Sequence, residues 1–334
     1  MSYDSRKEKG SSVYFYPYSH NNDFININQK EIESLGFNIT PIRQLFSFGA
    51  WRARKNSVLI LNWVEDQMYR SGISLFHALT LFVWFFIIAL LGKVMTNNII
   101  WVRHNYVPHN AKGNLYLHAL MCKILNMLST RQICLETYYG QQTIPHPLYL
   151  SDEQIQFKLA EIEFDVHTRP RFAFVGAIKS YKGIHKALAS WPKCQPMLIA
   201  GACDDIAYAQ RLEAIIEERG LEVECRYGYL SDHALEGILK SYDFIVLAHE
   251  DNRMISSGTF YHAITFGCNL LCLPSKFTLT KAAEHDFVHV LTPSEFTPDN
   301  IERLPLISRK QVMQEALRHY SREKIRNVWR TILS

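Results

Sequence analysis

The chain has 334 residues, of which 48% are apolar and 20% are charged, with a net charge of +4. This length favours two domains, and the composition is that of a globular protein and not of a disordered chain. The seven cysteines are odd in number and mostly lie in or beside apolar runs, which argues against a disulfide framework and predicts buried, reduced thiols in a cytosolic protein. Because the polar segment Met1–Ser12 lacks the apolar core of a signal peptide, we expect no secretion.

Charge is divided unevenly between the two halves of the chain. Residues 1–150 carry 14 Lys/Arg and 8 Asp/Glu, a net charge of +6, whereas residues 151–334 carry 22 and 24, a net charge of −2. The basic half therefore favours an anionic partner, either phospholipid or a phosphate-bearing acceptor.

The first half alternates apolar strand-like runs with helical segments. A helix that ends at Gly36 separates the first two runs, and this alternation predicts a parallel sheet with crossover helices. A helix is also expected over Leu115–Leu128, and the prolines around His146 indicate a connector. The predicted strands are Val13–Tyr16, Phe37–Thr40, Ser57–Leu61, Ile99–Val102 and Gln132–Leu135.

The segment Arg43–Lys55 interleaves three aromatic residues with basic ones. Such a mixture suits a membrane interface, where rings lie at the level of the headgroups and cations meet anionic lipid. Nucleic-acid binding is the less favoured interpretation, because a single short basic patch is weak support for it. A solvated surface loop remains the plain alternative.

The most apolar stretch of the chain is Leu75–Leu91, which we expect to form a helix. Its 17 residues fall short of the roughly 20 needed to span a bilayer. Spanning would also separate strands of one sheet into different compartments. A crossover helix on a sheet should have one polar face, and this stretch has almost none. We therefore expect a second apolar face covered by a partner or by the bilayer surface, with a helix buried on all sides as the alternative.

The second half predicts a six-stranded doubly wound domain. A capping box at Ser151–Gln154 opens a short helix, a second helix runs from Asp204 to Gly220, and Arg309–Leu333 forms a charged helical tail. The ligand of such a domain lies outside the carboxyl ends of its strands, where Gly176, Gly201, Gly228, Glu250 and Gly258 occur. The predicted strands are Phe172–Val175, Met197–Ala200, Glu222–Cys225, Phe244–Val246, Leu270–Leu273 and Val288–Leu291.

Small residues follow the fourth of these strands. Ser257, Gly258 and Thr259 stand where a loop becomes a short helix, so their backbone N–H groups can face a ligand, and the helix N-terminus favours an anion such as a diphosphate. Glu250, upstream of them, could accept hydrogen bonds from ribose or sugar hydroxyls. The alternative is that Ser257 only caps the helix and Gly258 only turns the chain.

Four segments resemble motifs of one known family and occur in its order: Leu61–Glu65, Trp101–His109, Phe174–Gly183 and Ser257–Gly267. The first is similar to the family's His-Trp-Pro-Glu pattern, with Asn62 and Val64 replacing His and Pro. The second matches Thr-Val-His-Asn-Leu-X-Pro-His, the third Gly-X-Ile-X-X-Tyr-Lys-Gly, and the fourth a Ser-Gly and Ala-X-X-X-Gly helix. The chain thus resembles bacterial GT-B glycosyltransferases that use nucleotide sugars to build exopolysaccharide, capsule or O-antigen.

This resemblance implies an α/β fold with two Rossmann-like domains that face each other across a cleft. Residues 1–150 would bind acceptor, residues 151–308 would bind the donor nucleotide, and residues 309–334 would form a helical tail that crosses back to the first domain. The fold usually needs no metal for the diphosphate, so we expect none and no cofactor. Asp204-Asp205 also suits a helix start, the interpretation that we favour over a metal motif.

The expected reaction is substitution at an anomeric carbon, in which charge builds on the leaving phosphate. Lys182 is the first candidate to neutralise it, with N–H groups from Ser257, Gly258 and Thr259. Arg226 is a weaker candidate. The remaining residues of the expected donor site are Gly176, Tyr229 and Glu250.

The first domain supplies the expected catalytic residues. The family position of His104 contacts the donor sugar, although a structural histidine is the alternative. An inverting reaction needs a general base, for which Glu65 is the first candidate and Asp66 the second. A retaining reaction needs none, and Asn62 in place of His weakens any acceptor role of its motif.

The apolar helix and the basic surface fit a polyprenyl-diphosphate-linked oligosaccharide acceptor. We therefore expect a cytoplasmic enzyme peripherally associated with the inner face of the cell membrane, and no nucleic-acid partner. GDP-mannose is the first candidate donor and a UDP-hexose the second. The alternatives are a catalytically silent GT-B scaffold in a polysaccharide assembly complex and a GT-B UDP-sugar epimerase.

Overall fold

The structure, a computed structural model, describes residues 11–70, 72–105, 113–162, 169–249 and 255–334. Its contacts divide the chain into two compact units. Unit 1 combines the described part of Met1–Pro147 with Ile255, Ser256 and Arg322–Ser334, and unit 2 contains the described residues of Leu148–Arg253 together with Ser257–Ser321. All seven cysteines are free, and Cys194 is exposed, contrary to the expectation that these thiols are buried.

Unit 1 is built on a parallel sheet of five strands in the order β2-β1-β3-β4-β5. The predicted strands are confirmed to within one residue at either end. Because β1 has β2 on one side and β3 on the other, the strand order reverses at β1 and β3. The strands are β1 (Ser12–Tyr16), β2 (Asn38–Pro41), β3 (Ser57–Asn62), β4 (Asn98–Arg103) and β5 (Arg131–Cys134).

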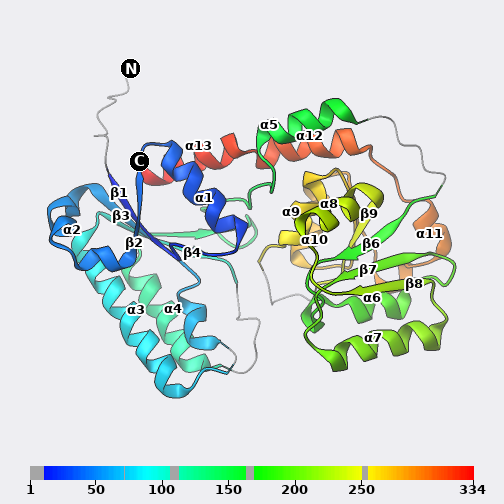
Figure 1. Cartoon of the computed structure of the whole chain (residues 1–334), viewed down its shortest axis with the longest axis horizontal. Helices are drawn as coiled ribbons and strands as arrows, with labels where there is room; N and C mark the ends of the chain where they lie inside the picture. The colour runs from blue at the N-terminus through cyan, green and yellow to red at the C-terminus, as the bar shows by residue number, and fades with distance from the viewer. Residues whose placement is uncertain (1–10, 71, 106–112, 163–168, 250–254) are drawn as a thin grey trace. The chain divides into compact units, whose positions relative to one another are not determined.

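Helices cover both faces of this sheet (Figure 1). One face packs against α1 (Asp23–Ser34) and α13 (Arg322–Leu333), and the other against α3 (Leu75–Met95) and α4 (Leu115–Leu128). The indole Nε1 of Trp329 in α13 donates to Oδ1 of Asn28 in α1 at 2.6 Å. This buried contact fixes the last helix of the chain in unit 1.

The helix α3 is buried along one side only. Ala78, Phe85, Ile88, Ala89, Gly92 and Met95 face the sheet and the neighbouring helices. The opposite side exposes Leu75, Phe76, Leu79, Val83, Ile87, Leu90 and Val94. The alternative of a helix buried on all sides is therefore wrong. Within the described residues, α3 is the one helix that is long and apolar enough to cross a membrane. It packs, however, against strands β3 and β4 of the unit 1 sheet.

The basic and aromatic segment before β3 is largely helical. It forms a 3-10 turn over Ile42–Phe46, the helix α2 (Phe48–Ala53) and a second 3-10 turn over Arg54–Asn56. The Oγ atom of Ser47 caps α2 by accepting from the amide of Ala50 at 3.1 Å. The segment is therefore not a plain solvated loop, because it contains a short capped helix.

Unit 2 is built on six parallel strands in the order β11-β10-β9-β6-β7-β8. The three strands that come first in the chain lie on one side and the three that follow on the other, which is the doubly wound order of dinucleotide-binding domains. Its order reverses between β6 and β9. The strands are β6 (Phe172–Val175), β7 (Met197–Gly201), β8 (Val223–Tyr227), β9 (Phe244–Leu247), β10 (Asn269–Cys272) and β11 (Val288–Val290).

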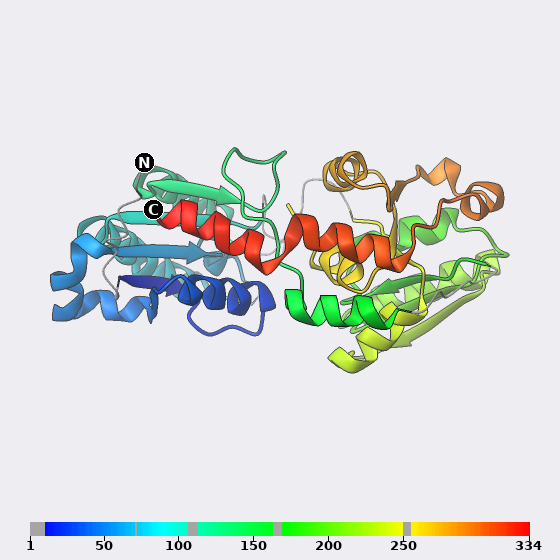
Figure 2. The same cartoon turned by 90° about the horizontal axis from the view of Figure 1, so that it is seen from above.

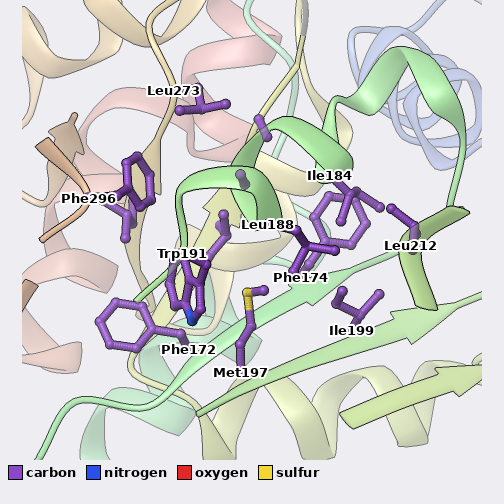
Figure 3. Close-up of a cluster of buried hydrophobic side chains, with 14 of the residues drawn as sticks. Phe172, Phe174, Ile184, Leu188, Trp191, Met197, Ile199, Leu212, Leu273 and Phe296 are labelled. Carbon is purple, nitrogen blue, oxygen red and sulfur yellow. The ribbon is translucent and has the colours of Figure 1, made fainter. Parts of the chain in front are cut away.

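Both faces of this sheet are also covered. The helices α6 (Ile184–Ser190) and α7 (Ile206–Arg219) lie on one face, where Ile301 of α11 joins their core, and the other helices of unit 2 except α11 lie on the opposite face (Figure 1). Trp191, at the end of α6, packs edge-on against Phe172 of β6 at 5.4 Å in the core shown in Figure 3. The remaining helices are α5 (Asp152–Glu161), α8 (Asp232–Ser241), α9 (Gly258–Thr265), α10 (Lys276–Glu284), α11 (Pro298–Glu302) and α12 (Arg309–Tyr320).

The predicted helical tail consists of two helices, α12 and α13, separated by Ser321. The first packs in unit 2 and the second in unit 1. The pair Asp204-Asp205 begins a helix, as we favoured, because the side chain of Asp205 accepts from the amide of Tyr208 and caps α7.

Candidate functional site

The candidate donor site lies in unit 2, where the strand order reverses between β6 and β9. The chain leaves β6 at Gly176, makes a 3-10 turn over Ser180–Lys182 and enters α6 at Gly183. Gly183 has φ +66°, and a Cβ atom on it would lie 2.0 Å from the carbonyl oxygen of Ala248, which follows β9. Only glycine permits this approach, and it holds the Lys182 loop against the end of β9.

Lys182 is a buried cation at this point, with 8% of its surface exposed. Its Nζ atom lies 5.6 Å from the centre of the Phe174 ring. Burial and the charge of Lys179 lower the pKa of Lys182 to about 8, so the ammonium form still predominates at neutral pH. Within the described residues, Nζ has neither a hydrogen bond nor an ion pair. A buried ammonium in this state favours an anionic ligand.

Gly176 and Thr259 converge on the same ammonium group. A Cβ atom placed on Gly176 would lie 3.4 Å from Nζ of Lys182 and 3.5 Å from Oγ1 of Thr259. A side chain at Gly176 would therefore fill the space between the cation and the first turn of α9. Three residues predicted from separate parts of the sequence thus meet at one place.

The first turn of α9 supplies the other half of the site. Ser257 is buried, and its Oγ accepts from the amide of Phe260 at 3.4 Å, so it caps the helix as the plain alternative held. This cap leaves the amides of Gly258 and Thr259 without partners inside the helix, and the helix dipole adds positive charge there. Capping and anion binding are therefore compatible.

Two other predicted donor residues, Arg226 and Tyr229, are not brought to this group. Arg226 lies on β8 at the edge of the sheet, and its Nε donates to Oε1 of Glu224 at 2.6 Å, so its charge is already offset. Tyr229 is 87% exposed after that strand. Glu250 lies outside the described residues.

In unit 1, Asn62 occupies the end of β3, beside the end of β1 where the strand order reverses. Its Nδ2 donates to the carbonyl oxygen of Tyr16 at 2.8 Å, and its Oδ1 lies 3.0 Å from Nε2 of His104. Because a carbonyl only accepts, the amide nitrogen must face Tyr16 and the amide oxygen must face His104. Nε2 of His104 therefore carries the proton and donates to Asn62.

His104 is a buried, neutral imidazole. Burial and His146 lower the pKa of His104 to about 3, so at neutral pH it acts as a hydrogen-bonding group and not as a cation. The ring of Trp63 lies 4.1 Å from it, centroid to centroid. Trp63 has φ +52°, a left-handed conformation that non-glycine residues rarely adopt and that recurs at functional sites. The sequence singled out His104 but gave no sign that Asn62 and Trp63 hold it.

Glu65, the first candidate for a general base, is buried with 1% of its surface exposed. Its Oε2 accepts from the indole Nε1 of Trp101 at 3.0 Å. Burial and the neighbouring Asp66 raise the pKa of Glu65 to about 8, so it holds a proton through most of the neutral range. A general base must reach the proton that it removes, and this carboxyl group lies inside unit 1 instead.

Asp66 is partly open. Its Oδ2 accepts from Nδ2 of Asn105 at 2.9 Å, and its Oδ1 lies 3.6 Å from Nε2 of His118. Asp66 is therefore less deeply buried than Glu65, although its Oδ1 is itself buried and accepts no hydrogen bond from the described residues.

Glu65→Gln should stabilise unit 1 increasingly as the pH rises above 4.5. Between pH 4.5 and about 8, Glu65 of the wild type is protonated in the folded state and ionised in the unfolded chain. The contribution of protonated Glu65 to the free energy of unfolding is therefore complete below pH 4.5 and is lost as the pH rises towards 8. The limiting slope is about 1.4 kcal/mol per pH unit. Glutamine stays neutral in both states and escapes this loss. Urea unfolding across this range measures the difference.

The matched control is Glu33→Gln, on the exposed side of α1. It should leave the pH dependence of unfolding unchanged. A Glu65→Gln difference that is constant with pH would show that Glu65 is ionised in the folded protein.

Comparison with known proteins rests on structure alone. No family model and no curated protein matches this sequence. Among solved structures, AviGT4, a glycosyltransferase involved in avilamycin A biosynthesis, is similar with a TM-score of 0.60 and 12% identity over 97% of this chain and 96% of its own. Anabaena HepE in complex with UDP and glucose is similar with a TM-score of 0.60 and 11% identity over 97% and 99%. The chain has the GT-B fold.

The two parallel sheets with their helices confirm the expected α/β class and its GT-B architecture. A GT-B fold alone does not determine chemistry. The N-terminal domain of Candida albicans trehalose-6-phosphate phosphatase is similar as well, with a TM-score of 0.60 and 8% identity over 97% of this chain and 96% of its own. Function has to be argued from the residues of the site.

Proposed function

We propose that this GT-B protein is a glycosyltransferase whose unit 2 binds the diphosphate of a nucleotide sugar. The observation that carries the proposal is the convergence of Lys182, Gly176 and Thr259 where the strand order reverses. A buried ammonium, a space kept open by glycine and the first turn of a helix form a positively charged site that suits a phosphate group. The similarity to glycosyltransferases supports the same activity.

The proposed reaction forms a bond between an acceptor hydroxyl oxygen and the anomeric carbon of the donor sugar. The bond from that carbon to the diphosphate breaks, and its electron pair goes to the leaving phosphate oxygen. Lys182 and the amides of α9 stabilise this developing charge. If the reaction inverts configuration, Asp66 takes the hydroxyl proton. His104, which burial keeps neutral and which donates to Asn62, is a hydrogen-bonding group for the sugar.

A titration with GDP, UDP, dTDP and CMP tests the donor site. The nucleotide of the true donor should raise the melting temperature selectively, because binding to the folded state adds about 2.7 kcal/mol at a hundredfold excess over Kd. GDP-mannose is our first candidate, and the UDP and glucose in the HepE structure support a UDP-hexose as the second. A melting temperature that none of the four nucleotides raises would favour the scaffold alternative. Conversion of a UDP-sugar without acceptor would indicate an epimerase.

We further propose that unit 1 binds the cytoplasmic face of a membrane, where its acceptor would be a polyprenyl-diphosphate-linked oligosaccharide. The exposed apolar side chains of α3 recur every three or four residues and so form one stripe along the helix. The neighbouring α2 adds exposed Phe48 and Trp51, with the guanidinium groups of Arg52 and Arg54 at 4.8 Å and 4.4 Å from their rings. Apolar groups beside cations suit an anionic lipid surface.

The double variant Phe76→Asp/Val83→Asp should abolish binding to vesicles that contain anionic lipid. It removes two exposed apolar groups of the stripe and adds negative charge, which should lower partitioning by about 10²-fold or more. Flotation at low and physiological salt measures it. The matched control is Phe157→Asp in unit 2, since Phe157 is 66% exposed and Phe76 75%. Wild-type protein that stays soluble with anionic vesicles at low salt would contradict membrane binding.

A further inference from the structure

Three potential metal ligands meet in unit 2, away from the proposed donor site. They are His285, which ends α10, and Glu315 and His319 of α12, the helix beside α5 in both views (Figures 1 and 2). One ligand atom from each of the three lies within 4.8 Å of the others. We propose that these residues bind a divalent transition metal of the zinc class, which joins the last turn of α12 to the end of α10.

The spacing and geometry suit such an ion. Glu315 and His319 are four residues apart, so they lie on the same face of α12 one turn from each other. Nδ1 of His285 is 2.6 Å from Oε1 of Glu315, and the imidazole rings of His285 and His319 are 5.1 Å apart and nearly perpendicular. Two imidazoles and one carboxylate form a donor set that zinc uses with a water as fourth ligand.

The surroundings of His285 match those of a metal-binding histidine. Its side chain is fully buried, and both of its ring nitrogens have hydrogen-bond partners. Its Nε2 lies 2.6 Å from the hydroxyl of Tyr320. When a metal occupies Nδ1, the single imidazole proton is on Nε2 and is donated to this hydroxyl. Such a partner on the second ring nitrogen is the usual companion of a histidine ligand.

The charges nearby leave Glu315 available for the metal. Lys281 is a cation beside His285, and its Nζ donates to Oε2 of Glu284 at 2.9 Å and to the hydroxyl of Tyr320 at 3.2 Å. Its charge is therefore balanced by Glu284, whose Oε2 is 3.9 Å from Nε2 of His285. The carboxylate of Glu315 then balances part of the charge of the ion. Because Ser321 follows this turn, the ion would stabilise α12 where the chain passes from unit 2 into unit 1.

Titration of chelator-treated full-length protein with Co²⁺ tests the site. We expect one equivalent to bind with the visible absorption of a four- or five-coordinate ion and without a thiolate charge-transfer band. Zn²⁺ should displace it and raise the melting temperature. His319→Ala should weaken binding by more than about 10²-fold, since losing only a hydrogen-bond partner of a ligand already costs about 10- to 100-fold. His233→Ala, at an exposed position of α8, should bind like the wild type.

Because His319 is exposed, its alanine variant should melt like the metal-free wild type, so a loss of binding would not reflect misfolding. The proposal is overturned if wild-type protein takes up no Co²⁺ in excess. It is also overturned if His319→Ala binds as tightly as the wild type or if thiolate absorption appears. The three residues would then form only a hydrogen-bonded network.

Discussion

Lys182→Met should lower the affinity for the donor nucleotide by about 10- to 100-fold and turnover by about 10²- to 10³-fold. The binding loss follows from removing a charged hydrogen-bond donor worth about 1.5–3 kcal/mol, and the larger loss in turnover from removing charge stabilisation that grows in the transition state. The fold should survive, because methionine fills the same space without a buried charge. Calorimetric titration and transfer assays measure the two effects.

Lys179→Met is the matched control for this variant. The side chain of Lys179 is 51% exposed and its Nζ lies 3.8 Å from Oδ2 of Asp204, so this ion pair contributes little to stability. Its removal should raise the pKa of Lys182 and leave nucleotide binding unchanged or slightly tighter. If Lys182→Met binds nucleotide like the wild type but loses stability, Lys182 is a structural residue and the donor-site proposal fails.

The strands were predictable because each is a short apolar run between turn-forming residues. Phe172–Val175 is one example, with the same bounds in sequence and structure. The sequence predicted that the sheet is doubly wound but not which strands are neighbours in it. The placement of β9 beside β6 depends on pairing between residues about seventy positions apart, such as Phe172 with Phe244. The length of α3 was underestimated, since Gly92 and Lys93 interrupt the apolar run although the helix continues to Met95.

The sequence predicted those site residues whose position depends on the local backbone, and it failed for those whose role depends on burial and on distant partners. Lys182 and Thr259 belong to loop and helix-start patterns, and the fold brings both to Gly176. Glu65 follows a strand as a catalytic carboxylate would, but Trp101, 36 residues later, binds it inside the core. Arg226 likewise follows the pattern of a strand-end cation, and its partner Glu224 is apparent only once the two side chains are seen on the same face. Sequence order does not reveal such partners.

Gly183→Ala should be among the most destabilising single changes in unit 2, at about 3–5 kcal/mol. Alanine at this position would have to keep the left-handed backbone conformation, which costs about 1–2 kcal/mol. Its methyl group would also lie 2.0 Å from a backbone oxygen, a clash that no side-chain rotation can relieve. Either α6 or the end of β9 must move, and Lys182 moves with it. We therefore expect nucleotide binding to be lost even in the fraction that folds. Urea unfolding followed by circular dichroism, with a nucleotide titration, measures both.

Gly220→Ala separates the cost of the left-handed conformation from the cost of the clash with the backbone oxygen. Gly220 ends α7 with φ +59°, close to the value at Gly183, but a Cβ atom there would meet nothing within 4 Å. Its alanine variant should therefore lose only the conformational part, about 1–2 kcal/mol, and keep its affinity for nucleotide. Equal losses in the two variants would mean that Gly183 is needed for its φ angle alone. A larger loss at Gly183, accompanied by loss of nucleotide binding, would tie the approach of the Lys182 loop to β9 directly to donor binding.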